Sequence, residues 1–141
     1  MKNIQKLFLT AIFILFTGLS QAAEVDVEIR GDISGILNDG DVISVGRLIC
    51  REQHIGFQVK ILAYPQDGNG DKYVVAGHND SRHKLKLRLK GNGWKSQAET
   101  DGIMKNSSDM TEVFYVVADG QQKPVADSYK IRVSGACVLP D

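Results

Sequence analysis

Apolar and polar residues alternate along most of this chain in short runs. Alternation with a period of two is typical of strands that bury one face, and the Gly, Asn, Asp and Pro residues between the runs favour turns. No segment longer than a turn or two has helical spacing. The pattern predicts an all-β fold, an antiparallel sandwich. Its predicted strands are 25–29, 42–51, 56–62, 72–76, 83–90, 112–118 and 128–138.

Three segments refine this prediction. The run 112–118 is apolar at nearly every position, which indicates a central strand. The segments 64–71 and 94–110 are rich in turn-forming or polar residues, so both are expected to be loops. Trp94 follows a turn and does not lie in the strand after Cys50, so the domain departs from the antibody type.

The first 22 residues have the composition of a secretory signal peptide. Lys2 and Lys6 precede an uncharged apolar run at 7–19, and Ser20 and Ala22 place small residues where a signal peptidase reads them. We predict cleavage after Ala22, which removes 22 of the 141 residues and leaves one domain, 23–141. Without the two lysines, 15 basic and 17 acidic side chains remain, so the charge gives no case for nucleic-acid binding.

The chain has two cysteines, Cys50 and Cys137. In an exported protein two cysteines are most simply a disulfide, and two alone cannot supply a four-ligand zinc site. Cys50 has the parity of Leu48 in its predicted strand, and Cys137 has that of Ile131 and Val133 in the last one. Both sulfurs should therefore point between the sheets, where a bridge would tie an early strand to the last.

The predicted sandwich is one strand short. An immunoglobulin-like sandwich ends with a strand after the one that carries the second cysteine, but here only 138–141 follows. The last strand would then lack a partner and leave an apolar groove lined by Tyr129, Ile131 and Val133. We therefore expect an incomplete immunoglobulin-like sandwich lacking its last strand, completed by a strand that another chain donates.

Several segments resemble, in order along the chain, the AfaD/DraD invasin family, the minor subunits of Afa/Dr adhesins and of related aggregative adherence fimbriae. They are Gly-Arg-Leu-Ile-Cys-Arg-Glu-Gln-His-Ile-Gly-Phe-Gln-Val (46–59), Lys-Tyr-Val-Val (72–75), Arg-His-Lys-Leu-Lys-Leu-Arg (82–88), Gly-Asn-Gly-Trp (91–94) and Ser-Gly-Ala-Cys-Val-Leu-Pro (134–140). The resemblance implies export through a periplasmic chaperone and an outer-membrane usher to the fimbrium on the cell surface. It also implies a donor strand from the major fimbrial subunit, and adhesion to and invasion of host cells through integrins.

The start of the predicted mature chain bears on its place in a fibre. A polymerising subunit needs an extension ahead of its first strand to donate, but Val25 follows the predicted cleavage site almost at once. The sequence therefore favours a terminal, or tip, subunit that receives a strand and gives none. The alternatives are a polymerising structural pilin, in which 25–29 is itself the donor, and a free-standing secreted binding module with a complete sandwich.

One candidate binding motif is the tripeptide Arg30-Gly31-Asp32, which some integrins recognise. It directly follows a predicted strand, at a junction with a turn where a side chain can project. The alternative is an ordinary turn with a chance match.

A second candidate is a basic stripe in the run 83–90, where the leucines face one way and the cations the other. An acidic glycan, a bacterial polyanion or an acidic partner would suit such a stripe. The alternative is a solvated strand face whose charges discourage edge pairing. The stripe consists of Lys84, Lys86, Arg88 and Lys90.

The sequence contains no pattern that indicates catalysis. The serines lack the flanking signature of an activated nucleophile, and no glycine loop for phosphate is present. The segment 67–71 begins like a calcium loop, but Lys72 stands where the glycine belongs. We predict no enzyme activity, no cofactor and no metal.

Overall fold

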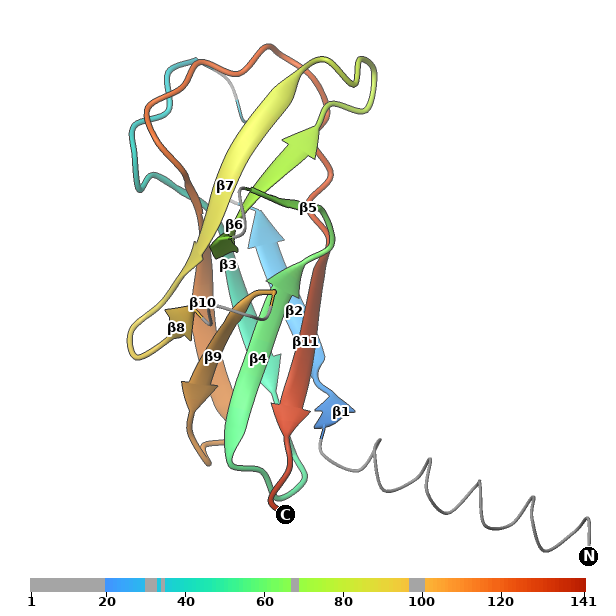
Figure 1. Cartoon of the computed structure of the whole chain (residues 1–141), viewed down its shortest axis with the longest axis vertical. Helices are drawn as coiled ribbons and strands as arrows, with labels where there is room; N and C mark the ends of the chain where they lie inside the picture. Colours follow the sequence, from blue (N-terminus) through green and yellow to red (C-terminus); the bar gives the residue numbers. More distant parts are fainter. Residues whose placement is uncertain (1–19, 30–32, 34, 67–68, 97–100) are drawn as a thin grey trace, which may run out of the picture.

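The computed structural model describes residues 20–29, 33, 35–66, 69–96 and 101–141, which form two packed antiparallel sheets (Figure 1). One sheet has the order β1-β11-β4-β9-β8 and the other β2-β3-β10-β7-β6-β5. The strands of the first sheet are β1 (Ser20–Ala22), β4 (Gly56–Ile61), β8 (Lys95–Ser96), β9 (Ile103–Asn106) and β11 (Val133–Val138). Those of the second sheet are β2 (Glu24–Ile29), β3 (Val42–Ile49), β5 (Tyr64–Gln66), β6 (Asn69–Ala76), β7 (Lys84–Lys90) and β10 (Thr111–Ala118). None of the described residues belongs to a helix long and apolar enough to cross a membrane.

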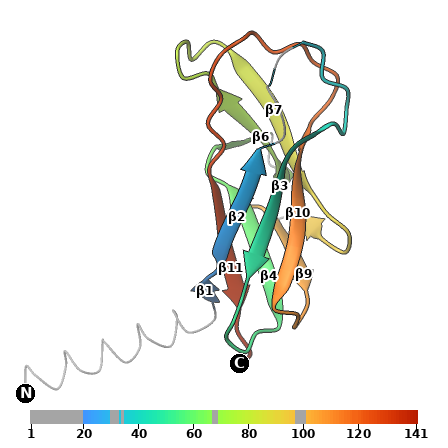
Figure 2. The ribbon, with the colours of Figure 1, turned by 180° about the vertical axis from the view of Figure 1, so that it is seen from behind.

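The hydrophobic core lies between the two sheets, and the alternation of the strands supplies it. On β7 the three leucines are at most 3% exposed, while Lys84, Lys86 and Lys90 face solvent. Strand β10 lies between β3 and β7, which confirms the central place predicted from its composition. Figure 2 shows β2, β3, β10 and β7 side by side in the second sheet. The predicted all-β sandwich is confirmed.

A disulfide joins Cys50, just after β3, to Cys137 in β11. It links the two sheets, because β3 and β11 belong to different ones. Both cysteines are buried, at 2% and 4% exposure. The bridge therefore ties the strand that ends the chain to the opposite sheet.

Two segments predicted as loops contain strands. β5 pairs antiparallel with β6, with Tyr64 opposite Val74, so the described residues of 64–71 belong to two paired strands. Pro65 is tolerated there because β5 is an edge strand. In the segment 94–110, β8 pairs with β9, and β9 pairs with β4. These strands have only two and four residues, too few to show an alternating pattern in a polar stretch.

The last strand is shorter than predicted. It begins at Val133, whereas the expected strand began at Ser128. Other partners hold the backbone before it: the N–H of His78 donates to the Ser128 carbonyl at 2.8 Å, and that of Leu62 to the Arg132 carbonyl at 2.8 Å. The segment 128–132 is therefore anchored to neighbouring turns and not to a ladder.

Candidate functional site

The outer edge of β11 is the site that the fold singles out. β1 pairs with this edge in an antiparallel ladder that sets Ser20 opposite Val138 and Ala22 opposite Ala136. The ladder ends where the N–H of Ala23 donates to the carbonyl of Gly135 at 3.1 Å. The last strand was expected to lack a partner, and the structure gives it one. That partner is the end of the predicted signal peptide, which the prediction had set aside.

The direction of the backbone groups on β11 follows from this register. Successive residues of an antiparallel strand point their N–H and C=O groups to opposite sides. The Gly135 carbonyl faces β1, whereas the Val138 carbonyl accepts the N–H of Ile55 on the β4 side at 2.8 Å. The backbone groups of Val133, Gly135 and Cys137 therefore form the outer edge that β1 covers in part.

Gly135 shapes the interior behind this edge. A Cβ at this position would lie 2.3 Å from Cδ2 of Leu48 and 2.9 Å from Cγ2 of Val25. The absence of a side chain therefore lets β2 and β3, in the other sheet, pack closely against β11. Val25 and Val133 are partly buried against the core at this edge. The junction of β11 with β2 is thus an apolar seam between the edges of the two sheets.

The three residues predicted to line the groove lie along this seam or lead into it. Val133 is the first residue of β11, and Ile131 packs partly buried against the core. Tyr129 precedes the strand, is 9% exposed, and donates its hydroxyl hydrogen to the carbonyl of Val125 at 2.5 Å. Tyr129 therefore anchors the chain before the edge begins.

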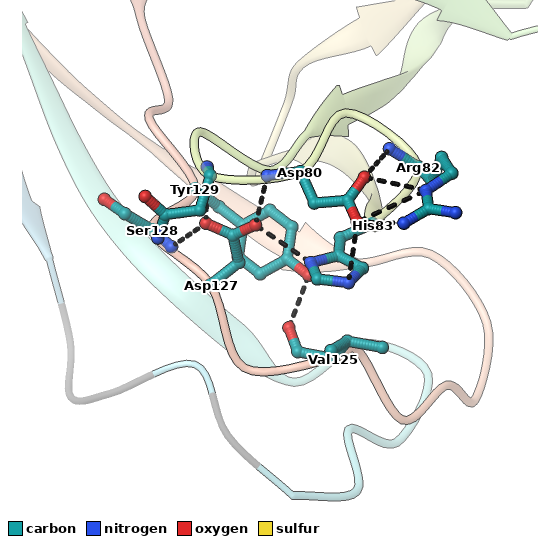
Figure 3. Close-up of polar contacts among 8 residues, drawn as sticks. Asp80, Arg82, His83, Val125, Asp127, Ser128 and Tyr129 are labelled. Carbon is teal, nitrogen blue, oxygen red and sulfur yellow. Dashed lines mark hydrogen bonds and ion pairs between the residues drawn. The ribbon is translucent and has the colours of Figure 1, made fainter.

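Asp127 is a second anchor of the segment before β11 (Figure 3), and no sequence pattern pointed to it. Its carboxylate is 0% exposed and accepts the N–H groups of Asn79 at 3.0 Å, Asp80 at 3.1 Å and Ser128 at 2.6 Å. Nδ1 of His83 lies 2.9 Å from Oδ2 of Asp127, the oxygen that also accepts the N–H of Asp80. An isolated acidic residue in a polar stretch gives no sequence signal for such a role.

These contacts have an electrostatic consequence. The N–H of Asn79 makes the largest contribution to holding the pKa of Asp127 well below its usual range, against the opposing effect of burial. His83, Ser128 and Asp80 act in the same direction as Asn79. The charged carboxylate therefore ties the segment 127–129 to the turn between β6 and β7.

Of the two binding motifs predicted from the sequence, the structure describes only the basic stripe. Arg30, Gly31 and Asp32 lie outside the described residues. Within the described ranges, no group of three or more His, Cys, Asp or Glu residues could hold a metal ion.

The basic stripe lies on β7, but its members are not equivalent. Lys84, Lys86 and Lys90 are exposed. Nη1 of Arg88 lies 2.5 Å from Oδ1 of Asp39 and 3.3 Å from Oδ1 of Asp119. Its hydrogen bond is the first cause of the lowered pKa of Asp39. Arg88 therefore links the loop that holds Asp39 to the turn after β10 that holds Asp119. Of the four predicted members, the three lysines form the exposed stripe.

The fold and its partly covered edge define a class of protein: an immunoglobulin-like subunit of a fimbrium. Comparison with known proteins narrows this class. The model of the family described as Enterobacteria AfaD invasin protein matches residues 33–135. The chain belongs to this family, as its resemblance to AfaD/DraD proteins predicted.

Individual relatives agree with this assignment. Protein AfaD of Escherichia coli is 37% identical over 131 residues, which are 92% of this chain and 88% of that protein. The E. coli Hda pilus minor tip subunit HdaB has a similar structure, with a TM-score of 0.81 and 31% identity over 85% of each chain. The Salmonella adhesin SafD gives a TM-score of 0.77 and 25% identity over 86% of this chain and 90% of its own. The chain is accordingly a minor adhesin subunit of a cell-surface fimbrium, and its family is one of structural subunits.

Proposed function

We propose that this chain is the terminal subunit of its fimbrium and that the outer edge of β11 accepts a donor strand from the major subunit. The observation that carries the proposal is the pairing of Ser20–Ala22 with this edge. Cleavage after Ala22 would remove those residues and leave the edge open beyond the bond from Ala23. A donated segment would take their place and extend along the strand.

The physical gain from a donor strand has two parts. The outward backbone groups of Val133, Gly135 and Cys137 would be paired, at a net gain of about 0.5–1.5 kcal/mol for each hydrogen bond. Apolar donor side chains would also cover the partly buried Val25 and Ile131 along the seam. An uncovered strand edge with this apolar seam is an aggregation hazard, and a donated strand removes it.

The route and the host contact belong to the same proposal. A periplasmic chaperone would cover the edge until an outer-membrane usher exchanges it for the donor strand. At the fibre tip, the subunit would attach to host cells and promote their invasion through an integrin. The terminal place is supported by the relative HdaB, a minor tip subunit.

Thermal unfolding of the mature chain, 23–141, tests strand acceptance. We expect its melting temperature to rise when a peptide copied from the N-terminus of the accompanying major subunit is added. A ligand that binds only the folded state, at a concentration of about 100 times its dissociation constant, raises the free energy of unfolding by about 2.7 kcal/mol. The matched control is the same peptide with its apolar alternation shifted by one residue, because this shift turns every side chain to the other face.

The other outcomes of this experiment favour the alternatives. A high melting temperature that neither peptide changes would mean a self-complete, free-standing module. Purified copies that assemble into fibres without another subunit would mean a polymerising pilin, with 25–29 as the donor.

A further inference from the structure

A donor strand has a direction, and the direction decides where the rest of its subunit lies. β1 runs antiparallel to β11, from Ser20 opposite Val138 toward Ala22 opposite Ala136, and the chain then passes Gly135. A donor segment that takes the same path enters at the Val138 end and leaves at the Val133 end. Because the donor is an N-terminal extension, the body of its subunit follows and lies beyond Val133.

The end of the molecule beyond Val133 is a pole made of loops. The segment 119–132 leads into β11, and the described residues of 33–41 lead into β3; both lie at the end opposite the C-terminus in Figure 1. An isolated β-bridge joins them, in which the N–H groups of Leu37 and Gln122 each donate to the other's carbonyl, at 2.8 and 2.9 Å. We call this end the exit pole, and define it by the described residues of 33–41 together with 119–132.

Two large apolar side chains project from the exit pole. Ile36 is 62% exposed and Val125 is 55% exposed. Each lies near the bridge that joins the loops, Ile36 immediately before Leu37 and Val125 three residues after Gln122. A single exposed apolar side chain is ordinary on a protein surface. The direction of the donor strand, however, would place the body of another subunit against this end.

The exit pole is also held firmly. Asp127 fixes the segment 127–129 to the turn between β6 and β7, and Tyr129 holds the carbonyl of Val125 (Figure 3). The side-chain amide of Gln122 donates to the carbonyl of Lys86 at 2.9 Å. Apolar residues on a fixed backbone cost little entropy when a partner covers them. The same contacts that anchor the chain before β11 therefore also hold the backbone of Val125 in place.

We propose that Ile36 and Val125 form a docking surface for the body of the major subunit whose N-terminal strand occupies the β11 edge. This inference rests on the proposed strand acceptance and adds a second contact to it. The contact would fix the angle between the terminal subunit and the fibre, because it adds a second point of attachment beside the donor strand. The opposite pole, with the C-terminus, would then be the free end of the fibre.

Photo-crosslinking tests this placement directly. A photoreactive p-benzoylphenylalanine replaces Ile36 or Val125, one at a time, in the mature chain, which is then complexed with the whole major subunit. We expect crosslinks to residues of the major subunit's body. The matched controls are Ile55 and Met110, which are 54% and 57% exposed. Both lie near the Val138 end of β11, because the N–H of Ile55 donates to the carbonyl of Val138 and the carbonyl of Met110 accepts the N–H of Cys50. Crosslink yield at the exit pole should exceed theirs several-fold.

A second measurement separates docking from strand binding. The double variant Ile36→Ser/Val125→Ser should shorten the lifetime of the complex with the whole subunit by about tenfold, as loss of about 1.4 kcal/mol predicts. The lifetime of the complex with the donor peptide alone should not change. Equal crosslinking at both poles, or no difference between variant and wild type with the whole subunit, would overturn the docking surface while leaving strand acceptance intact. Failure of the peptide itself to bind would refute both.

Discussion

Removal of the disulfide is the perturbation whose magnitude the structure fixes best. The bridge between Cys50 and Cys137 spans 87 residues of sequence, so it restricts most of the unfolded mature chain. In the chain-entropy model, a loop of this length stabilises the fold by roughly 4.5 kcal/mol. For a domain of about 120 residues, that loss should lower the melting temperature by roughly 15–20 °C.

The assay compares the wild type with the double variant Cys50→Ala/Cys137→Ala in urea titrations under oxidising conditions. The double variant leaves no single thiol to mispair. The wild type kept reduced by a thiol reagent is its control, because it lacks the crosslink but keeps both buried sulfur atoms. We expect both to lose most of the stability of the oxidised wild type, and secretion of the variant to fall with it. A double variant within about 1 kcal/mol of the oxidised protein would refute the reasoning.

Three further substitutions test the core and the Asp127 anchor. Gly46→Ala places a Cβ 2.0 Å from Cζ of Phe114, so it should lower the free energy of unfolding in urea by about 1–3 kcal/mol; no loss would mean that the ring can move aside. Trp94→Phe removes an indole N–H that donates to a β10 carbonyl at 3.0 Å, and the same titration should show a loss of about 1 kcal/mol. Asp127→Asn removes a carboxylate whose pKa the N–H of Asn79 holds below its usual range. Because the Asp127 carboxylate binds a proton more readily in the unfolded state than in the folded state, its ionised form stabilises the fold. This contribution to the free energy of unfolding is present above pH about 4 and is lost as the pH falls below it. Melting temperatures across this range should fall more steeply for the wild type than for the variant, and parallel curves would contradict the assignment.

The sequence predicted the fold because its long strands alternate strictly. The leucines of β7 and the apolar run of β10 determine which faces are buried, and the parity of Cys50 and Cys137 placed both sulfurs between the sheets. The two- and four-residue strands β8 and β9 escaped prediction because so few residues cannot show a period. Their pairing depends on β4, which is distant in sequence.

The candidate site could be predicted only in outline. Val133 was predicted to line a groove beside the last strand, and it does lie at the start of β11, whose outer edge is the candidate site. The anchoring of the segment 127–132 could not be predicted, because Asp127 depends on backbone N–H groups nearly fifty residues away. The strand predicted from the alternating pattern of 128–138 therefore began five residues too early, since β11 begins at Val133.

Amide hydrogen exchange along β11 tests the central claim most directly. The N–H groups of Gly135 and Cys137 face the outer edge, whereas those of Ser134 and Ala136 face β4. In the mature chain alone we expect fast exchange at Gly135 and Cys137 and slow exchange at the other two. Addition of the donor peptide should make all four slow. Protection of Gly135 and Cys137 without any donor, or no change at these two amides when the peptide binds, would contradict strand acceptance at this edge.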